Sequence, residues 1–196
     1  MQFTPVRMRI IKYDSEDHKL IIGIKNSDPA AYKQLYYKYS DPIFGFIYKN
    51  IREQELSRDL TQTIFMKLWE NRSRLDSEKS IKSYLYKAAN NRIIDHYRAK
   101  KTLTTSDPAE LEQGYEFNYD NSFLKDEIHK AVNTLPQMQK NVFSLSRFEE
   151  LSYREISETL NISERTVETH LRRAVIKLRE LLSHLKIILF LFLINV

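Results

Sequence analysis

The chain has 196 residues, enough for one or two small domains, and a net charge of +5 that favours a polyanionic partner. It contains no cysteine, which excludes disulfides, thiolate metal sites and cysteine-based catalysis and is compatible with a reducing cytosol. Only three glycines and five prolines, among many Leu, Ile, Lys and Glu residues, predict an all-α protein.

The N-terminal stretch is predicted to be a loose lead-in followed by helices. Residues 1–18 lack the continuous apolar core of a signal peptide, and apolar residues recur at helical spacing from Lys19 onward. Asp28 is a candidate N-cap before Pro29, and Asp41-Pro42 separates one apolar stripe from the next. Tyrosines at helical spacing are interpreted as packing residues: Tyr32, Tyr36, Tyr37, Tyr39 and Tyr48.

Residues 55–69 form the next predicted helix and a candidate docking surface. An i, i+4 ridge is expected to face inward, consisting of Leu56, Leu60, Ile64 and Leu68. Phe65 and Trp69 cannot both join this ridge. With polar neighbours around them, they resemble the rim of a protein interface. The alternative is that these aromatic residues are part of the core.

A polar loop over residues 71–80 precedes a basic helix predicted over residues 83–101. Leu85, Ala89, Ile93 and Tyr97 share its expected buried side. Seven cations oppose the single Asp95: Lys79, Lys82, Lys87, Arg92, Arg98, Lys100 and Lys101. Aromatic and polar residues are interleaved with them: Tyr84, Tyr86, Asn90, Asn91 and His96. Cations contact phosphates, aromatic rings stack on unpaired bases and amides read base edges, so the pattern favours single-stranded nucleic acid over a merely solvated face.

Residues 102–122 read as an acidic linker, with five acids and no Lys or Arg. The chain is therefore divided into a lead-in (1–18), a helical domain (19–101), the linker (102–122), a second helical domain (123–184) and an apolar tail (185–196). The tail has eight consecutive apolar residues, far short of the about 20 that span a bilayer. We expect it to pack on the second domain or a partner, with shallow membrane contact as the alternative.

Within the second domain, residues 151–180 have the layout of a helix-turn-helix that enters a DNA major groove. Ser152 and Glu155 have the spacing of a capping box, and Ser163 can cap the second helix. Asn161 tolerates the left-handed conformation that ends a helix abruptly. The second helix has an apolar stripe of Val167, Leu171, Ala174, Leu178 and Leu181. Such helix pairs also occur in ordinary bundles.

The ordered set of motifs resembles the sigma factors of bacterial RNA polymerase, in the small two-domain ECF group of the sigma-70 family. DLTQTIFMKLW (59–69) is similar to region 2.2, SIKSYLYKAANNRIIDHYRAKK (80–101) to regions 2.3 and 2.4, and residues 135–179 to region 4. This resemblance implies a protein without catalytic residues, cofactors, metals or small-molecule substrates. It also implies that the protein binds core polymerase and promoter DNA in the cytoplasm and is controlled by an anti-sigma factor, which in this family is often membrane-bound.

The resemblance also implies roles for individual residues. The core polymerase surface comprises Asp59, Gln62, Phe65, Lys67, Leu68 and Trp69. Melting and recognition of the minus-10 element involve Tyr84, Tyr86, Lys87, Asn90, Asn91, Arg92, Arg98, Lys100 and Lys101, with residues 76–80 forming a base pocket beside Asn91. The minus-35 element faces Glu164, Arg165, Thr166, Glu168, Thr169, Arg172 and Arg173.

Two departures from the family pattern are noted. Glu150 and Asn161 stand where the family usually has glycine, and Glu150 is expected to give a slightly different loop. The alternative function is a helix-turn-helix regulator of the LuxR/GerE type, whose C-terminal motif is similar to SERTVETHLRR (163–173).

Overall fold

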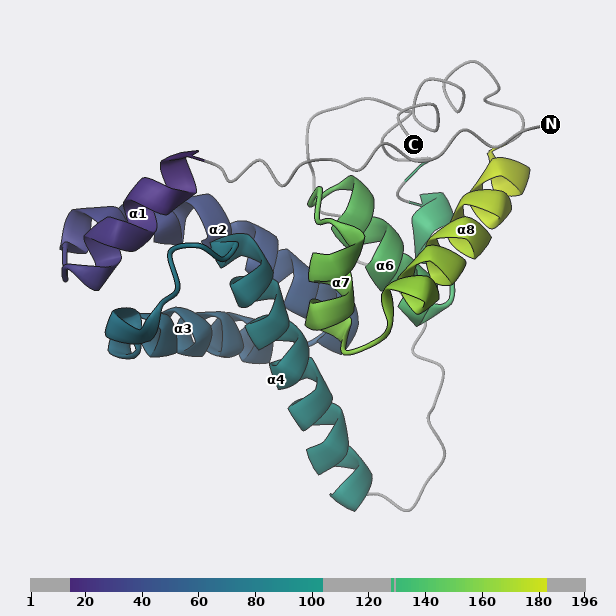
Figure 1. Ribbon diagram of the computed structural model, residues 1–196. Helices are drawn as coiled ribbons and strands as arrows, with labels where there is room; N and C mark the ends of the chain where they lie inside the picture. Colours follow the sequence, from purple (N-terminus) through teal and green to yellow (C-terminus); the bar gives the residue numbers. More distant parts are fainter. Residues whose placement is uncertain (1–14, 104–127, 129, 183–196) are drawn as a thin grey trace. The chain divides into compact units, whose positions relative to one another are not determined.

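The computed structural model describes residues 15–103, 128 and 130–182 (Figure 1). Helices and turns account for this part of the chain, with no strand in it, so the all-α prediction is confirmed. The described residues form two compact units: the first comprises residues 15–103 and also 158–161 at the end of α7, and the second comprises the other residues from 128 onward. The apolar tail and all but the first two residues of the acidic linker lie outside the described residues. No helix in the described part is long and apolar enough to cross a membrane.

The first unit is built around α2 (Pro29–Ile51), which packs against α1 (Ser15–Lys25), α3 (Gln54–Glu70) and α4 (Ile81–Leu103). Its apolar residues recur every three or four positions and so form one stripe that these helices cover. The stripe consists of Ala31, Leu35, Tyr39, Ile43, Phe46, Ile47 and Ile51. Since α1 begins at Ser15, the predicted lead-in of 1–18 overlaps a helix by four residues.

Contrary to the division expected at Asp41-Pro42, α2 runs without interruption through Pro42. A proline inside a helix removes one backbone hydrogen bond. The buried residues on either side of Pro42, Tyr39 and Ile43, lie four positions apart and continue the same stripe. Packing of this stripe outweighs the local preference. At its start, the carboxylate of Asp28 accepts a hydrogen bond from the Ala30 amide at 2.8 Å, as predicted for the N-cap.

The inward ridge of α3 differs from the predicted one. Leu56 and Leu60 are only half-buried, whereas Ser57 and Thr61 are buried. Their hydroxyls donate to backbone carbonyls one turn earlier, Ser57 to Glu53 at 2.6 Å and Thr61 to Ser57 at 2.8 Å. These hydrogen bonds satisfy the hydroxyls locally, so small polar residues fit inside the helix contact.

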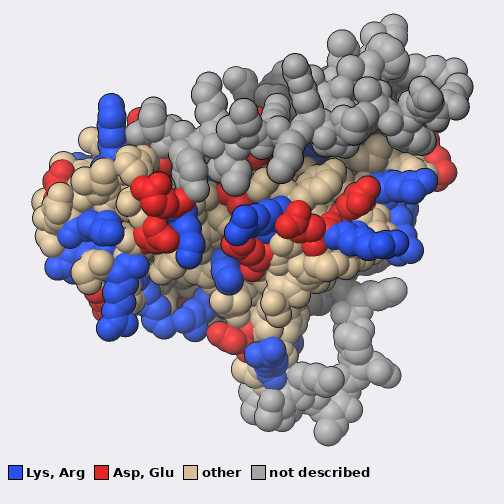
Figure 2. Space-filling model, in the orientation of Figure 1, with Lys and Arg blue, Asp and Glu red and all other residues tan. Residues whose placement is uncertain are grey.

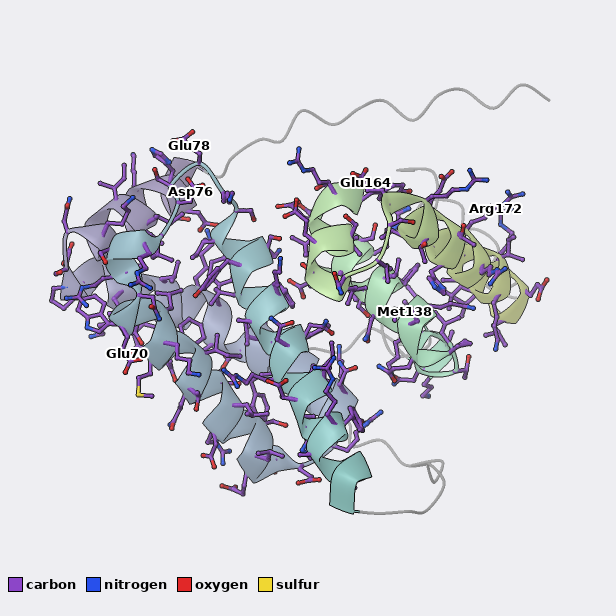
Figure 3. The ribbon with its side chains drawn as sticks, turned by 60° about the horizontal axis from the view of Figure 1, so that its bottom comes forward. Glu70, Asp76, Glu78, Met138, Glu164 and Arg172 are labelled. Atoms are coloured by element: carbon purple, nitrogen blue, oxygen red, sulfur yellow. The ribbon has the colours of Figure 1, made fainter. Side chains whose placement is uncertain are left out.

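The second unit contains α6 (Gln137–Arg147), α7 (Tyr153–Leu160) and α8 (Glu164–Leu181), with α6 packed on α8. The predicted α8 stripe is buried except for its last member. Leu181 is 42% exposed and Leu182 is buried in its place, because the stripe advances by four residues after Leu178. Met138, near the start of α6, is 39% exposed (Figure 3).

The turn between α7 and α8 has the predicted chemistry. Asn161 has a φ of 55°, and the Ile162 amide donates to the Ser157 carbonyl at 3.1 Å, which is the Schellman arrangement at a helix end. Ser152 and Glu155 form the reciprocal capping box, with the Ser152 amide 2.9 Å from the Glu155 carboxylate. Ser163 accepts from the Thr166 amide at 3.1 Å. Local side-chain bonds therefore set both ends of this corner.

Glu150 takes the left-handed conformation, with a φ of 54°, so it reproduces the backbone that glycine would adopt. The expected difference between this loop and the family's stays a prediction. The strain belongs to the side chain: a non-glycine residue in the left-handed region costs about 1–2 kcal/mol.

Replacing Glu150 with glycine is therefore expected to raise the unfolding free energy of the second unit by about 0.5–1 kcal/mol. Relief of strain exceeds the entropy that glycine adds to the unfolded chain. Chemical denaturation followed by circular dichroism measures this change. Glu180→Gly, in a right-handed position of α8, is the matched control and should destabilise by about 1 kcal/mol. A destabilised Glu150→Gly chain would show that the Glu150 side chain contributes more than its backbone costs.

Candidate nucleic-acid interface and docking surface

The outward face of α4 carries a continuous polar stripe. Because Leu85, Ala89 and Ile93 are buried on the side of α4 that faces α2 and α3, the residues on the opposite side face solvent. Tyr84 is 40% exposed. The other predicted residues in this stripe are also exposed: Lys87 and Asn91 follow Tyr84 at steps of three and four residues, and Arg98 lies two turns further on. Aromatic ring, cations and amide are thus aligned along one side of a single helix.

Other predicted α4 residues lie elsewhere on the helix. Tyr86 is 1% exposed, and its ring packs edge-on against Phe46, with centroids 5.2 Å apart. Its ring is therefore a packing element of the first unit. Tyr97, expected to be buried, is 44% exposed, and its hydroxyl donates to the Asn50 carbonyl. Burial raises the pKa of Tyr97, with Arg52 lowering it and Glu53 raising it.

The charges of α4 are mostly cationic at the surface. The acidic exception, Asp95, lies 3.4 Å from the guanidinium of Arg92, so part of its charge is compensated within the helix. Lys100 is exposed near the C-terminal end of α4, which also includes Lys101. Asn90 precedes Asn91 and projects from a different side of the helix, since successive residues turn by about 100°.

A short loop, residues 75–80, precedes α4 and has a defined internal geometry. The Asp76 carboxylate accepts from the Glu78 amide at 3.0 Å, and Ser80 caps α4 by accepting from the Ser83 amide at 3.1 Å. Leu75 is buried and anchors the start of the loop. Asp76 and Glu78 are exposed beside the N-terminal end of α4 (Figure 3).

The outward face of α8 carries the second polar set. Its exposed members are Glu164, Arg165, Glu168, Thr169, Arg172 and Arg173. Figure 2 shows Lys and Arg side chains gathered over α8 with acidic ones among them, and Figure 3 shows Glu164 and Arg172 projecting outward. Thr166 differs, because its hydroxyl lies 2.8 Å from that of Ser163 and takes part in the cap.

Tyr153, on α7, was not among the predicted site residues. Burial raises the pKa of its hydroxyl; Arg147 lowers the pKa and Glu168 raises it further. The last effect indicates that Tyr153 lies beside the polar face of α8. No sequence spacing could have found this pairing, because the two residues come from different helices.

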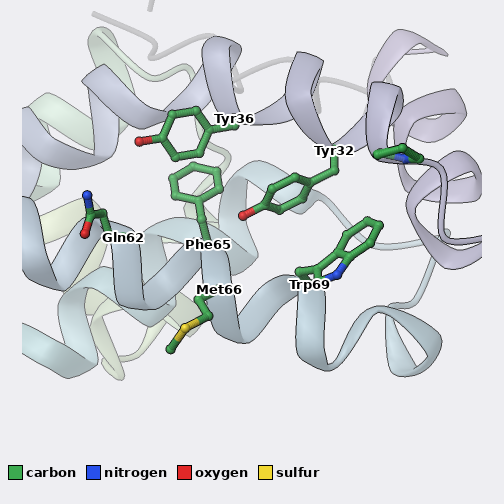
Figure 4. Close-up of a pocket in the computed structure, with 7 residues that line it drawn as sticks. Tyr32, Tyr36, Gln62, Phe65, Met66 and Trp69 are labelled. Carbon is green, nitrogen blue, oxygen red and sulfur yellow. The ribbon is translucent and has the colours of Figure 1, made fainter.

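A pocket of about 440 Å³ opens between α2 and α3 (Figure 4). Its lining residues are Pro29, Tyr32, Tyr36, Gln62, Phe65, Met66 and Trp69. Tyr32 packs on Trp69 and Tyr36 on Phe65, with ring centroids 5.0 and 4.9 Å apart. The guanidinium of Arg72 lies 4.7 Å from the Trp69 centroid. An open, aromatic-walled pocket suits an apolar side chain of a protein partner.

The residues predicted for docking divide into two groups. Asp59, Gln62 and Lys67 are exposed and Trp69 is half-exposed, whereas Phe65 and Leu68 are buried. Phe65 still lines the pocket, but Leu68 belongs to the core. Tyr32 and Tyr36, interpreted from sequence as packing residues, also line the pocket. Among the described residues, no cluster of three or more His, Cys, Asp or Glu side chains could hold a metal ion.

Two family models match the chain. The model for sigma-70 region 2 matches residues 35–102, and the model for sigma-70 region 4 matches residues 125–178. The first match covers most of α2, α3 and α4. The second covers α6, α7 and most of α8.

Several characterised proteins are similar over most of their length. RNA polymerase sigma factor SigZ of Bacillus subtilis is 31% identical over 161 residues, which cover 77% of this chain and 86% of the relative. The RNA polymerase sigma-H factor of Pseudomonas aeruginosa is 25% identical, with 81% and 90% covered. The ECF RNA polymerase sigma factor SigK of Mycobacterium sp. (strain KMS) is 23% identical, with 91% and 96% covered.

Solved structures with a similar fold include two protein complexes. Sigma factor RpoE of Bartonella quintana, crystallised with the anti-sigma factor NepR, aligns with a TM-score of 0.63 and 21% identity over 77% of this chain and 96% of that one. CnrH in complex with the cytosolic domain of CnrY aligns with a TM-score of 0.60 and 18% identity, with 86% and 98% covered. At these identities the likeness concerns the fold.

Proposed function

The chain belongs to the ECF subfamily of the sigma-70 family of RNA polymerase sigma factors, and we propose which of its surfaces binds each partner during transcription initiation. As a sigma factor it binds core RNA polymerase and directs promoter-specific initiation. The observation that carries the assignment of surfaces is that one chain presents two separate polar helix faces, on α4 and on α8, with different chemistry.

The α4 face is assigned to the melted minus-10 strand. Tyr84 offers a ring on which an unpaired base stacks, Asn91 an amide for a base edge, and Lys87 and Arg98 charges for phosphates. These groups bind more tightly to a single strand with unstacked bases than to a closed duplex. That difference in binding free energy shifts the promoter toward the open state without chemistry by this chain.

The α8 face is assigned to the duplex minus-35 element. A helix presented after a tight turn, with exposed Arg, Glu and Thr side chains in its first half, suits the major groove. Arg165 and Glu168 lie one turn apart and are assigned to base edges, with Arg172 and Arg173 on phosphates. Because the two elements are contacted by one chain, binding to the first raises the effective concentration of the second.

The aromatic pocket between α2 and α3 is assigned to core polymerase. Support comes from its half-exposed Trp69 and exposed Met66, with the exposed charges of Asp59 and Lys67 on the same helix, a mixture typical of an interface with an apolar centre and a polar rim. An anti-sigma factor is a second expected partner, since the structurally similar proteins RpoE and CnrH were solved as complexes, RpoE with an anti-sigma factor. The site of action is the cytoplasm, where polymerase works, with transient membrane association through a membrane-bound anti-sigma factor.

Two alternatives are set aside. A LuxR/GerE-type regulator leaves residues 35–102 unexplained, whereas region 2 of the sigma-70 family accounts for them. An enzyme acting on nucleic acid needs a reactive group or a metal, and the proposed surfaces offer stacking, amide and charge contacts instead.

Reconstituted transcription tests the proposal. Core polymerase incubated with the full chain and a genomic promoter library should start transcripts at a defined set of sites, absent when the chain is omitted. Failure to bind core polymerase would contradict the docking assignment and the mechanism together. Metal-dependent cleavage of DNA without polymerase would contradict the assignment as a non-enzymatic factor.

Asn91→Ala is expected to impair promoter opening more than formation of the closed complex. Loss of one amide contact to the unstacked base costs about 1 kcal/mol, roughly fivefold in the opening equilibrium. Permanganate footprinting measures opening, and gel retardation measures closed-complex binding. On a promoter with a pre-melted minus-10 bubble the defect should shrink. An equal defect on duplex and bubble templates would remove the basis for this role.

A further inference from the structure

The loop that precedes α4, residues 75–80, is held in place by α1. The His18 ring nitrogen Nδ1 lies 3.0 Å from the Ser77 carbonyl oxygen, 59 residues away in sequence. A carbonyl only accepts, so Nδ1 carries the proton and donates. This contact ties the middle of the loop to a helix that begins 20 residues before the region 2 match starts at residue 35.

A second contact fixes the approach to the loop. The Arg72 guanidinium donates from Nε to the Ser27 hydroxyl at 2.8 Å and from Nη1 to the Trp69 carbonyl at 2.9 Å. Ser27 follows α1 and has a φ of 65°. The segment from Arg72 to Ser77 is therefore bonded to α1, or to the turn after it, at both of its ends.

The helix that supplies these contacts, α1, is itself packed against α2. Leu20, Ile21 and Ile24 are buried, with Ile24 fully so. Lys38 of α2 lies 2.8 Å from the Asp17 carboxylate and 3.1 Å from that of Glu16. A Cβ atom at Gly23 would lie only 2.6 Å from that of Ala31, so glycine permits the close approach of α1 to α2. Because α1 is fixed against α2 by these contacts, the His18 side chain has a defined position from which to donate to the loop.

The bonds within the loop are weaker than those that fix α1, so the loop depends on contacts with the rest of the unit for its shape. Its internal bonds, from the amides of Glu78 and Lys79 to Asp76, and the 3.5 Å ion pair between Lys79 and Asp76 are exposed to solvent. Exposed pairs of this kind contribute little stability. The buried side chain of Leu75, the cap that Ser80 forms on α4 and the His18 bond link the loop to the body of the unit, and of these only the His18 bond holds its middle.

We propose that His18 is a positioning residue for selection of the minus-10 base: by holding the Ser77 carbonyl it sets the shape of the 75–80 loop, which borders the base pocket. The inference rests on the proposed function and on the resemblance to region 2.3, which implies that residues 76–80 form the base pocket. It makes α1, which contributes no side chain to the assigned DNA surface, a determinant of promoter choice.

The first test follows the loop in the full chain without DNA. Hydrogen exchange of the Glu78 and Lys79 amides should accelerate roughly tenfold in His18→Leu, which removes the donor. His18→Asn places an amide donor where Nδ1 was and should restore slow exchange. Lys19→Ala, on the exposed side of α1, is the matched control and should leave both amides unchanged. Unchanged exchange in His18→Leu would overturn the hold on the loop.

The second test measures selection in the polymerase holoenzyme. Transcription from promoters that differ in one minus-10 base should show a preference that falls roughly three- to tenfold in His18→Leu and returns in His18→Asn, with core polymerase affinity unchanged. If His18→Leu accelerates hydrogen exchange of the loop amides but leaves the minus-10 base preference unchanged, the proposed role of His18 in base selection is wrong. If the wild-type holoenzyme fails to transcribe, the proposed function fails instead, and the exchange experiment still decides whether His18 holds the loop.

Discussion

Replacing Trp69 with alanine is expected to weaken the affinity for core RNA polymerase by at least about 2 kcal/mol, or roughly 30-fold. Tryptophan side chains at the centre of a protein interface carry a large share of the binding free energy. Here the indole forms one wall of the pocket between α2 and α3 and is pre-ordered by Tyr32, 5.0 Å away, and Arg72, 4.7 Å away. Little entropy is then lost when a partner side chain enters the pocket.

Affinity is measured by fluorescence anisotropy of the labelled chain titrated with core polymerase. Tyr37→Ala provides the control, because Tyr37 is a 70% exposed aromatic residue of α2 that does not line the pocket. It should bind within about twofold of wild type, as expected for a residue outside the interface centre. Since Trp69 also packs on Tyr32, urea denaturation of both variants separates lost binding from lost folding. Equal affinities for a folded Trp69→Ala chain and wild type would place the docking surface elsewhere.

Replacing Arg165 with alanine is expected to reduce discrimination at one base pair of the minus-35 element by about 1–3 kcal/mol, roughly fivefold to more than a hundredfold. A guanidinium that donates two hydrogen bonds to a guanine edge rejects other bases with this energy. Arg165 is exposed in the first turn of α8, and its backbone carbonyl already accepts the Thr169 hydroxyl at 2.8 Å. The helix backbone at this position is thus independent of the guanidinium.

Transcription from promoters randomised at the minus-35 element measures this discrimination. Arg172→Ala is the matched control on the same helix, 1.9 turns further on by the geometry of about 3.6 residues per turn. As a proposed phosphate contact it should weaken binding to all sequences alike and lower the salt dependence. If Arg165→Ala behaves like Arg172→Ala, with uniform weakening, Arg165 contacts the backbone and not a base.

Local chemistry could be read from the sequence wherever the partners are close along the chain. The capping box of Ser152 and Glu155, the cap by Ser163 and the left-handed Asn161 are interactions within four residues. They depend on the residues themselves and on backbone sterics. Helical periodicity likewise predicted most of the buried stripes, and the ordered motifs indicated the family.

Tertiary structure decided the features that depend on partners from other helices. Ser57 and Thr61 face inward in place of Leu56 and Leu60, because the packed neighbours and not the hydrophobicity of α3 select its buried side. The docking pocket needs Tyr32 and Tyr36 from α2 beside Trp69 from α3. The hold of His18 on Ser77 spans 59 residues. Sequence spacing determined the helices and their ends, because these depend on bonds between residues close along the chain. Which helix faces meet was decided by packing between distant segments, and no single segment contains that information.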